Sequence, residues 1–395
     1  MRPMTKRKLT GFTLIELMIA MAVTMILLYA AVITFRDASQ TNQVVTQAAD
    51  MSDNLRNGLD MIQTDLQQAG SGIPTGGIPI PFTSNNSTTA PCGTTAPPSR
   101  PILNGKTTFP PCNSTFPGVE PGQAMGPLIT APDATAGNVS NPNSYTDEIT
   151  MFYADNLGLD SKPINALASA NPVNPGCPNG SLTLNGTTLS AVFDGSTLNS
   201  NGNYNCVNFV KNGITINPGD LIMFSNTLGE AVLAVTSVSN QTLTFSSGDA
   251  FNLNGRTEAG GTIKQLEPNG CGGTNSCFAN TTATRIWMVS YYLDNVTSPP
   301  YVRLIRQVGF GTATPVGETL ENLQFTYNFV DGDTNPANQP GVPAGDSESQ
   351  IMSVNVYLGA RSSYEVHQGN TTHFSRNNLM TQVSLRSMAY HNRYQ

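Results

Sequence analysis

A single carboxylate stands inside a long apolar run near the start of the sequence. Phe12 to Phe35 are 24 residues whose only charged side chain is Glu16, and a basic cluster ends before Gly11. A carboxylate costs at least ~2.5 kcal/mol at the centre of a bilayer, so such a residue usually has a partner. A cut between Gly11 and Phe12 would create an α-amino group one helical turn from Glu16. The predicted chemistry is ion pairing with that amine, within one chain or between neighbouring helices.

The side chains that usually carry catalysis are sparse. The three histidines, His367, His373 and His391, all lie near the C-terminal end. The sequence contains no G-x-S-x-G, H-E-x-x-H or P-loop motif. A Ser-His-Asp arrangement is set by geometry and stays open, although nothing singles out its members. We therefore expect no enzyme activity and no organic cofactor.

One segment near the C-terminal end gathers oxygen ligands. Asp331, Asp333 and Asn335 fall at alternate positions, as at the start of a calcium loop. Pro336 stands where the EF-hand turn requires glycine, and Val342 stands where that loop has its bidentate glutamate. The segment is therefore not an EF-hand. An irregular calcium site and a polar hairpin tip both remain open.

The cysteines favour disulfides over a metal site. The chain has six: Cys92, Cys112, Cys177, Cys206, Cys271 and Cys277. None forms a C-x-x-C pair, and an even count in loop-rich surroundings of an exported chain is typical of disulfides. Nearest-neighbour pairing closes the shortest loops and so costs the least chain entropy. Other pairings and unpaired buried thiols remain open.

Composition indicates an exported, strand-rich protein. Charged residues make up 11 %, whereas glycine and proline number 36 and 27. Such a chain is typical of all-β or α+β secreted proteins rather than cytosolic enzymes. The net charge is −7, and the four basic residues before Gly11 leave the remainder more acidic still. We therefore predict no nucleic-acid partner.

The apolar run is long enough to cross a membrane. Its 24 residues would span about 36 Å as a helix. It is too long for a cleaved secretory signal, and no A-x-A-like site follows it. The basic residues before it predict a cytoplasmic N-terminal side. We expect a single pass through a membrane, with the rest of the chain on the side away from the cytoplasm.

The helix is predicted to continue to Ala69. Apolar residues recur in steps of three and four, as one stripe of an amphipathic helix. The stripe comprises Val45, Ala48, Met51, Leu55, Leu59, Ile62, Leu66 and Ala69. Gly58 is the interior breaker, and Gly70-Ser71-Gly72 supplies a C-cap. The stripe should lie on a sheet, and a coiled-coil stalk is the alternative.

Strand patterns follow a region rich in turn formers. Five parts are expected: a leader (1–11), a membrane or filament-core half-helix (12–35), an amphipathic half-helix (36–70), a Pro/Gly/Ser/Thr-rich loop region (71–146) and a β-rich head (147–395). The predicted strands are Glu148–Ala154, Ser181–Phe193, Ile214–Ser225, Ala231–Val238, Thr242–Ser246, Thr262–Leu266, Thr284–Leu293, Tyr301–Val308, Leu323–Phe329, Ile351–Ala360 and Met380–Ser387. Residues 181–270 could form an inserted β unit.

The segment "GFTLIELMIAM" resembles the class III signal of type IV pilins and pseudopilins. The resemblance implies that prepilin peptidase cuts after Gly11 and N-methylates Phe12. It also implies that Glu16 helps to recruit each subunit into a growing fibre. The implied partners are this peptidase, major and other minor pilins, the inner-membrane assembly platform, and membrane lipid before assembly.

Further segments resemble minor pilins of the PilW type. They are "LRNGLDMIQTDLQQAGSG" from Leu55, "INPGDLIMFSNTLGEAVLAV" from Ile216, "YVRLIRQVGFGTATPVGETLENLQFTYNFVDGD" from Tyr301, "NVYLGARSS" from Asn355 and "LMTQVSLRSM" from Leu379. The likeness fails over residues 71–146. It implies an α+β, pilin-like fold in which a long N-terminal helix packs on an antiparallel sheet, with an additional β-rich insertion.

The expected function is therefore assembly rather than catalysis. The chain would enter, or prime, a type IV pilus and so reach the cell surface. A pseudopilin of type II secretion is one alternative, although such heads are usually smaller. A pilus-tip adhesin that binds through residues 71–146 is another, and an anchored periplasmic enzyme is a third.

Overall fold

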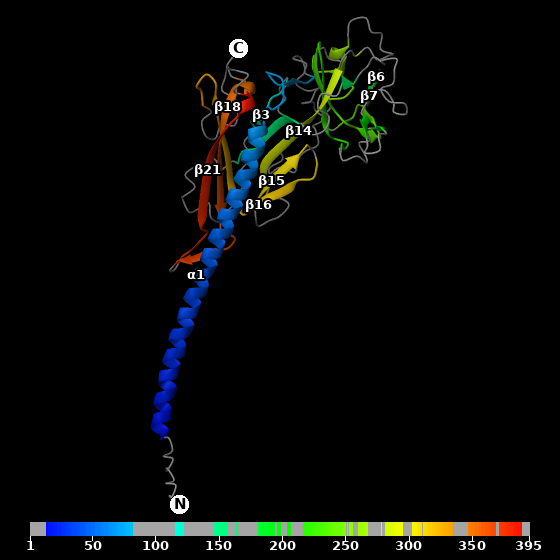
Figure 1. Ribbon diagram of the computed structural model, residues 1–395. Helices are drawn as coiled ribbons and strands as arrows, with labels where there is room; N and C mark the ends of the chain where they lie inside the picture. Colours follow the sequence, from blue (N-terminus) through cyan, green and yellow to red (C-terminus); the bar gives the residue numbers. More distant parts are fainter. Residues whose placement is uncertain are drawn as a thin grey trace, which may run out of the picture. The chain divides into compact units, whose positions relative to one another are not determined.

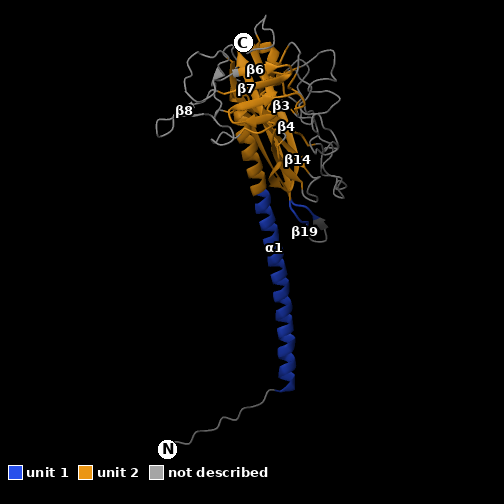
Figure 2. Cartoon of the chain, turned by 90° about the vertical axis from the view of Figure 1, so that its right-hand side faces the viewer, with its two compact units in different colours: residues 1–52, 362–375 blue, residues 53–361, 376–395 orange. Residues whose placement is uncertain are grey.

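The computed structural model describes a large part of the chain. The described residues are 13–81, 115–121, 146–155, 163–164, 181–193, 196–198, 204–206, 216–249, 251, 253–255, 260–267, 278, 281–294, 302–309, 311–334, 347–368 and 371–388. The chain divides into two compact units (Figure 2). The N-terminal unit comprises residues 1–52 and 362–375, and the head unit comprises residues 53–361 and 376–395.

The predicted long helix is present as α1, Leu14–Gln68, which runs for 55 residues without a break (Figure 1). Its stripe is buried later than predicted, because Val45 is 61 % exposed and burial begins at Met51. The buried members are Met51, Leu55, Leu59, Ile62, Leu66 and Ala69. Helical spacing predicts which side chains share a face, but not where that face meets another element.

Two glycines set how α1 ends and how it packs. Gly70 has a φ of +77°, the left-handed conformation of a C-cap, and its N–H donates to the carbonyl of Phe152 at 2.8 Å. At Gly58 a Cβ would lie 2.9 Å from Cδ2 of Leu304 and 3.1 Å from Cδ2 of Leu358. The predicted breaker is therefore a point of close approach between helix and strands.

A large antiparallel sheet lies beneath the end of α1 in the head unit. Its strand order is β11-β10-β14-β15-β16, and β3, β4 and β5 join through β14 and β4. The strands are β3 (Val119–Pro121), β4 (Ile149–Ala154), β5 (Pro163–Ile164), β10 (Leu221–Asn226), β11 (Gly229–Ala234), β14 (Thr281–Asp294), β15 (Arg303–Val308) and β16 (Thr314–Glu318). The 14 residues of β14 make it the strand on which the others align.

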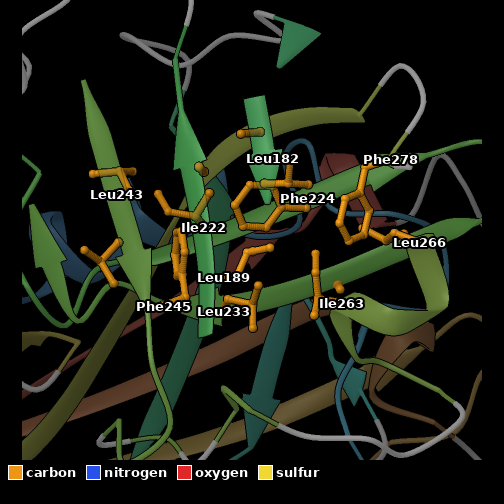
Figure 3. Close-up of a cluster of buried hydrophobic side chains, with 14 of the residues drawn as sticks. Leu182, Leu189, Ile222, Phe224, Leu233, Leu243, Phe245, Ile263, Leu266 and Phe278 are labelled. Atoms are coloured by element: carbon orange, nitrogen blue, oxygen red, sulfur yellow. The ribbon is translucent and has the colours of Figure 1, made fainter. Parts of the chain in front are cut away.

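A small sheet of order β12-β13-β7-β6 packs on one end of the large sheet. Its strands are β6 (Ser181–Asn185), β7 (Thr188–Val192), β12 (Ser237–Ser239) and β13 (Thr242–Phe245). Figure 3 shows the core between them, where Phe224 of β10 meets Phe245 of β13 edge to face, with ring centroids 5.3 Å apart. Ile263 and Leu266 of the short helix η3 (Ile263–Leu266) close this core.

A third sheet, of order β17-β18-β21, carries the C-terminal part of the head unit. Its strands are β17 (Leu320–Phe329), β18 (Ile351–Arg361) and β21 (Arg376–Ser384), and the short helix η4 (Glu348–Gln350) precedes β18. Three two-stranded sheets complete the described strands: β1 (Ile78–Pro79) with β2 (Thr115–Phe116), β8 (Ser196–Leu198) with β9 (Tyr204–Cys206), and β19 (Val366–Gln368) with β20 (Thr371–His373). The last of these sheets belongs to the N-terminal unit.

The predicted α+β class, with a long N-terminal helix packed on an antiparallel sheet and an additional β-rich part, is confirmed. All strand pairs in the described residues are antiparallel. The β-rich part at 181–270 is only partly separate, because β10 and β11 belong to the large sheet. The apolar run of β10 is buried along Leu221–Phe224, as in a central strand.

Several local predictions were wrong. Ser181–Phe193 was expected as one strand but forms the antiparallel pair of β6 and β7, and the strand expected from Ile214 begins at Leu221 as β10. Thr262–Leu266 was expected as a strand, but Ile263–Leu266 forms η3, whose Ile263 and Leu266 fill the core from a single turn. Residues three apart share one face of a 3₁₀ turn, whereas in a strand they point to opposite faces. The loop region 71–146 contains the short strands β1, β2 and β3, whose Ile78, Phe116 and Val119 are buried. Strands of two or three residues are too short to produce a readable alternation.

Candidate functional site

The predicted processing site lies at the start of α1. Gly11 and Phe12 lie outside the described residues, whereas Glu16 lies in the first turn of the helix. Its Oε2 accepts hydrogen bonds from the backbone N–H of Thr13 at 3.0 Å and from Thr13 Oγ1 at 2.9 Å. In return, Glu16 N donates to Thr13 Oγ1 at 3.4 Å. These reciprocal bonds form a capping box.

The capping box is a partner that the sequence interpretation missed. The signal was present, because Thr13-Leu14-Ile15-Glu16 fits the pattern of Ser or Thr followed three residues later by Glu. A carboxylate in the first turn also interacts favourably with the helix dipole. Glu16 therefore has a local role that needs no amine. Its pairing with an α-amino group stays a prediction.

The apolar part of α1 is uncovered by the rest of the chain. Every large apolar side chain from Leu14 to Phe35 is at least 42 % exposed. The helix contains a window long and apolar enough to span a bilayer, by length and composition. Such a surface is unfavourable in water by roughly 25 cal/mol for each Å² of apolar area. Lipid or neighbouring helices would remove that cost.

A buried ionic cluster holds the end of α1 in the head unit. Asp65, only 6 % exposed, accepts hydrogen bonds from Nε of Arg306 at 2.8 Å and from Nη2 of Arg306 at 3.2 Å. The hydroxyls of Tyr291 and Tyr153 donate to the same carboxylate at 2.6 and 3.1 Å. We call these four residues the Asp65 clamp. Through one carboxylate, the clamp connects α1 to three strands, β4, β14 and β15.

The charges of the clamp stabilise one another. Burial raises the pKa values of the Tyr153 and Tyr291 hydroxyls, and the negative charge of Asp65 raises them further. The hydrogen bond to Asp65 raises the pKa of Arg306. Their pairing was not predicted, because 241 residues separate them and no local pattern joins them.

A second buried carboxylate connects two sheets. Asp147, which precedes β4, is 2 % exposed, and its Oδ2 accepts the N–H of Phe325 in β17 at 2.9 Å. Its own N–H donates to the carbonyl of Leu323 at 2.8 Å. Burial raises the pKa of Asp147 from its ordinary 3.8 to about 7, against the lowering effect of the Phe325 bond. The carboxyl therefore gains a proton near neutral pH.

The predicted calcium site is only partly described. Asp331 and Asp333 are exposed, and the N–H of Asp333 donates to Oδ1 of Asp331 at 3.0 Å. Asn335 lies outside the described residues. Within the described ranges, no three His, Cys, Asp or Glu side chains come together as a metal site. Calcium binding stays a prediction.

The cysteine and histidine predictions remain mostly outside the described residues. Cys92, Cys112, Cys177, Cys271 and Cys277 lie outside them, and for Cys206 the structure describes only the backbone, in β9. The disulfides therefore stay predictions. His373 is exposed in β20.

Comparison with known proteins identifies the N-terminal segment. A model of the prokaryotic N-terminal methylation motif matches residues 6–32. The chain thus carries a prepilin-type N-terminal motif at the head of an apolar helix that fits membrane anchoring. The match covers a small part of the chain, so it identifies the segment and not the whole protein.

One solved structure is similar to part of the chain. It is a type IV-like pilin from Thermus thermophilus, with 12 % sequence identity over 44 % of this chain and 87 % of that chain. The TM-score is 0.17, and a likeness of that size carries no argument. No match was found among curated proteins.

Proposed function

We propose that this chain is a minor pilin that enters, or primes, a type IV pilus. The observation that carries the proposal is the N-terminal methylation motif on a helix whose apolar surface is left uncovered. Prepilin peptidase would cut after Gly11 and methylate Phe12. The helix would leave the inner membrane for a filament core, where Glu16 would pair with an α-amino group.

Each part of the chain would then have its own role in anchoring or assembly. Before assembly, Phe12 to Phe35 would anchor the chain in the inner membrane, with the head unit in the periplasm. In the fibre, the same surface would pack on major and other minor pilins, delivered by the assembly platform. The Asp65 clamp would keep the head fixed to the end of α1 while the helix is pulled from lipid.

The N-terminal peptide tests the proposal most directly. We expect mass spectrometry to find a chain that begins with N-methylated Phe12 in cells that have prepilin peptidase. Cells without the peptidase should retain Met1 or an unprocessed leader. The same start in both strains would contradict the proposal and make the helix an ordinary anchor.

A second measurement separates the pilus from a type II secretion system, since pseudopilins share this motif. We expect the protein in sheared surface fibres, together with the major pilin. Its recovery only with secretion components would favour the pseudopilin alternative.

A further inference from the structure

A cavity of about 880 Å³ lies in the head unit, and none of its lining residues belongs to the Asp65 clamp. It lies where two strands share one edge of β14. On that edge the pairing of β14 with β10 stops at Ile286, and its pairing with β15 starts at Val289. Trp287 and Met288 lie in the gap, and the turn at Gly309 bonds to the carbonyl of Met288 at 2.8 Å.

Cross-strand pairs place the cavity between two covered parts of the same sheet face. Arg285 pairs with Ile222, which is buried beneath the small sheet. Trp287 pairs with Tyr153, whose hydroxyl bonds to Asp65 of α1. Paired residues share a face of the sheet. Arg285 and Trp287 therefore lie between the two coverings, and the 880 Å³ volume is within the range of small-molecule sites.

The Arg285 guanidinium of the cavity lies between two carboxylates. The Nε of Arg285 lies 2.9 Å from Oδ2 of Asp155, and Nη1 lies 3.6 Å from Oδ2 of Asp220. The guanidinium also stands over the ring of Trp287, 4.1 Å from its centroid. A guanidinium between two carboxylates is a poor site for an anion. A carboxylate beside a guanidinium is a poor site for a cation.

Asp220 differs from the other acid that lines the cavity. The Asp249 carboxylate accepts the N–H groups of Phe251, Leu253 and Asn254, so it serves to hold its own turn. Asp220 accepts one backbone N–H, from Asn217 at 3.0 Å. Its side chain is 24 % exposed, so it can accept further hydrogen bonds from a ligand.

We propose that this cavity binds a neutral saccharide. Each sugar hydroxyl can donate to the Asp220 carboxylate and accept from the Arg285 guanidinium, so neighbouring hydroxyls match this pair. The C–H face of a sugar ring is apolar and suits the edge or face of Trp287. Because Arg285 is already paired with two carboxylates, these donors and acceptors beside one indole favour a neutral polyol over a phosphate. The proposal is independent of the proposed pilus function.

The fluorescence of the chain tests it, because Trp287 is its only tryptophan. The full-length chain would be titrated in a zwitterionic detergent without a sugar head group. The probes are glucose, galactose, N-acetylglucosamine and maltose, with sodium phosphate and arginine as charged comparisons. We expect a saturable change in emission with at least one saccharide, with a Kd in the millimolar range or below, on the order of 1 mM.

A matched pair of variants locates the site. Asp220→Asn should weaken the apparent affinity about tenfold or more, or roughly 1.4 kcal/mol. Asp331→Asn makes the same chemical change at an exposed position, and it should leave the affinity unchanged. If Asp220→Asn loses the far-ultraviolet circular dichroism of the native chain, Trp287→Phe replaces it, with binding followed by calorimetry.

Three outcomes would overturn the proposal. No saturable change with any of the saccharides would remove it. Saturation by phosphate or arginine alone would mean that the cavity takes a charged ligand. Equal saccharide affinity in the native chain and in the folded Asp220→Asn or Trp287→Phe variant would place the binding elsewhere.

Discussion

The two halves of α1 differ in what covers their apolar side chains. From Leu14 to Phe35, each large apolar side chain is exposed, and Glu16 is satisfied by its neighbour Thr13. From Leu55 onward, the stripe is buried, and Asp65 is bonded across the fold. The first half therefore depends on another medium, either lipid or other helices. The apolar side chains of the second half are covered by other parts of the same chain.

The comparison predicts that Asp65 is the most sensitive position of the covered half. Asp65→Ala would leave the partly buried Arg306 charge and the buried Tyr153 and Tyr291 hydroxyls without their acceptor, which should cost about 3 kcal/mol. Urea unfolding of the detergent-solubilised chain should show this loss. Asp60→Ala is the control, because Asp60 is exposed on the same helix. Similar midpoints for the two variants would mean that the clamp does not hold the helix.

The free energy of unfolding of the head unit, which covers the second half of α1, should also depend on pH. The pKa of Asp147 is raised from 3.8 to about 7, so the folded state holds the proton more tightly than the unfolded state. The free energy of unfolding should therefore decrease as pH rises from about 4 to 7, and then level off. Asp147→Asn should remove this part of the slope. An identical slope in both proteins would contradict the raised pKa.

Gly58 offers a smaller test of how closely α1 approaches the strands. Gly58→Val would force side-chain atoms against Leu304 and Leu358, and overpacking of this kind costs about 1–3 kcal/mol. Asn57→Val places the same side chain at an exposed neighbour, where only helix propensity changes. Thermal unfolding should separate the two. Equal melting temperatures would show that the helix can move away without cost.

The smallest change in folding free energy is expected in the exposed half. Thr13→Ala removes half of the capping box, which costs about 0.5–2 kcal/mol at the helix end. If Glu16 pairs with an α-amino group, Thr13→Ala should still enter fibres. Glu16→Ala should reach the membrane normally and be lost from fibres. Immunoblots of membranes and sheared fibres measure both, and equal losses would make the cap the whole role of Glu16.

Some elements of the fold could be predicted because their sequence signals lie within a few residues of one another. The helix was predicted within two residues at each end, since periodicity and the Gly70 cap are local signals. The hairpin of β6 and β7 was predicted as one strand, Ser181–Phe193, because its turn at Gly186 lies inside an otherwise strand-like run. The η3 turn was missed because its two apolar residues, Ile263 and Leu266, are too few to define a periodicity.

The sequence by itself determined the N-terminal motif, the long helix and the strand-rich character of the rest. Each depends on residues a few positions apart. Only the tertiary structure decided that Asp65 meets Arg306, that Asp147 joins β4 to β17, and that Asp220, Arg285 and Trp287 share a cavity. These contacts join residues far apart in the chain, and they follow from strand register, which the order of residues does not encode locally.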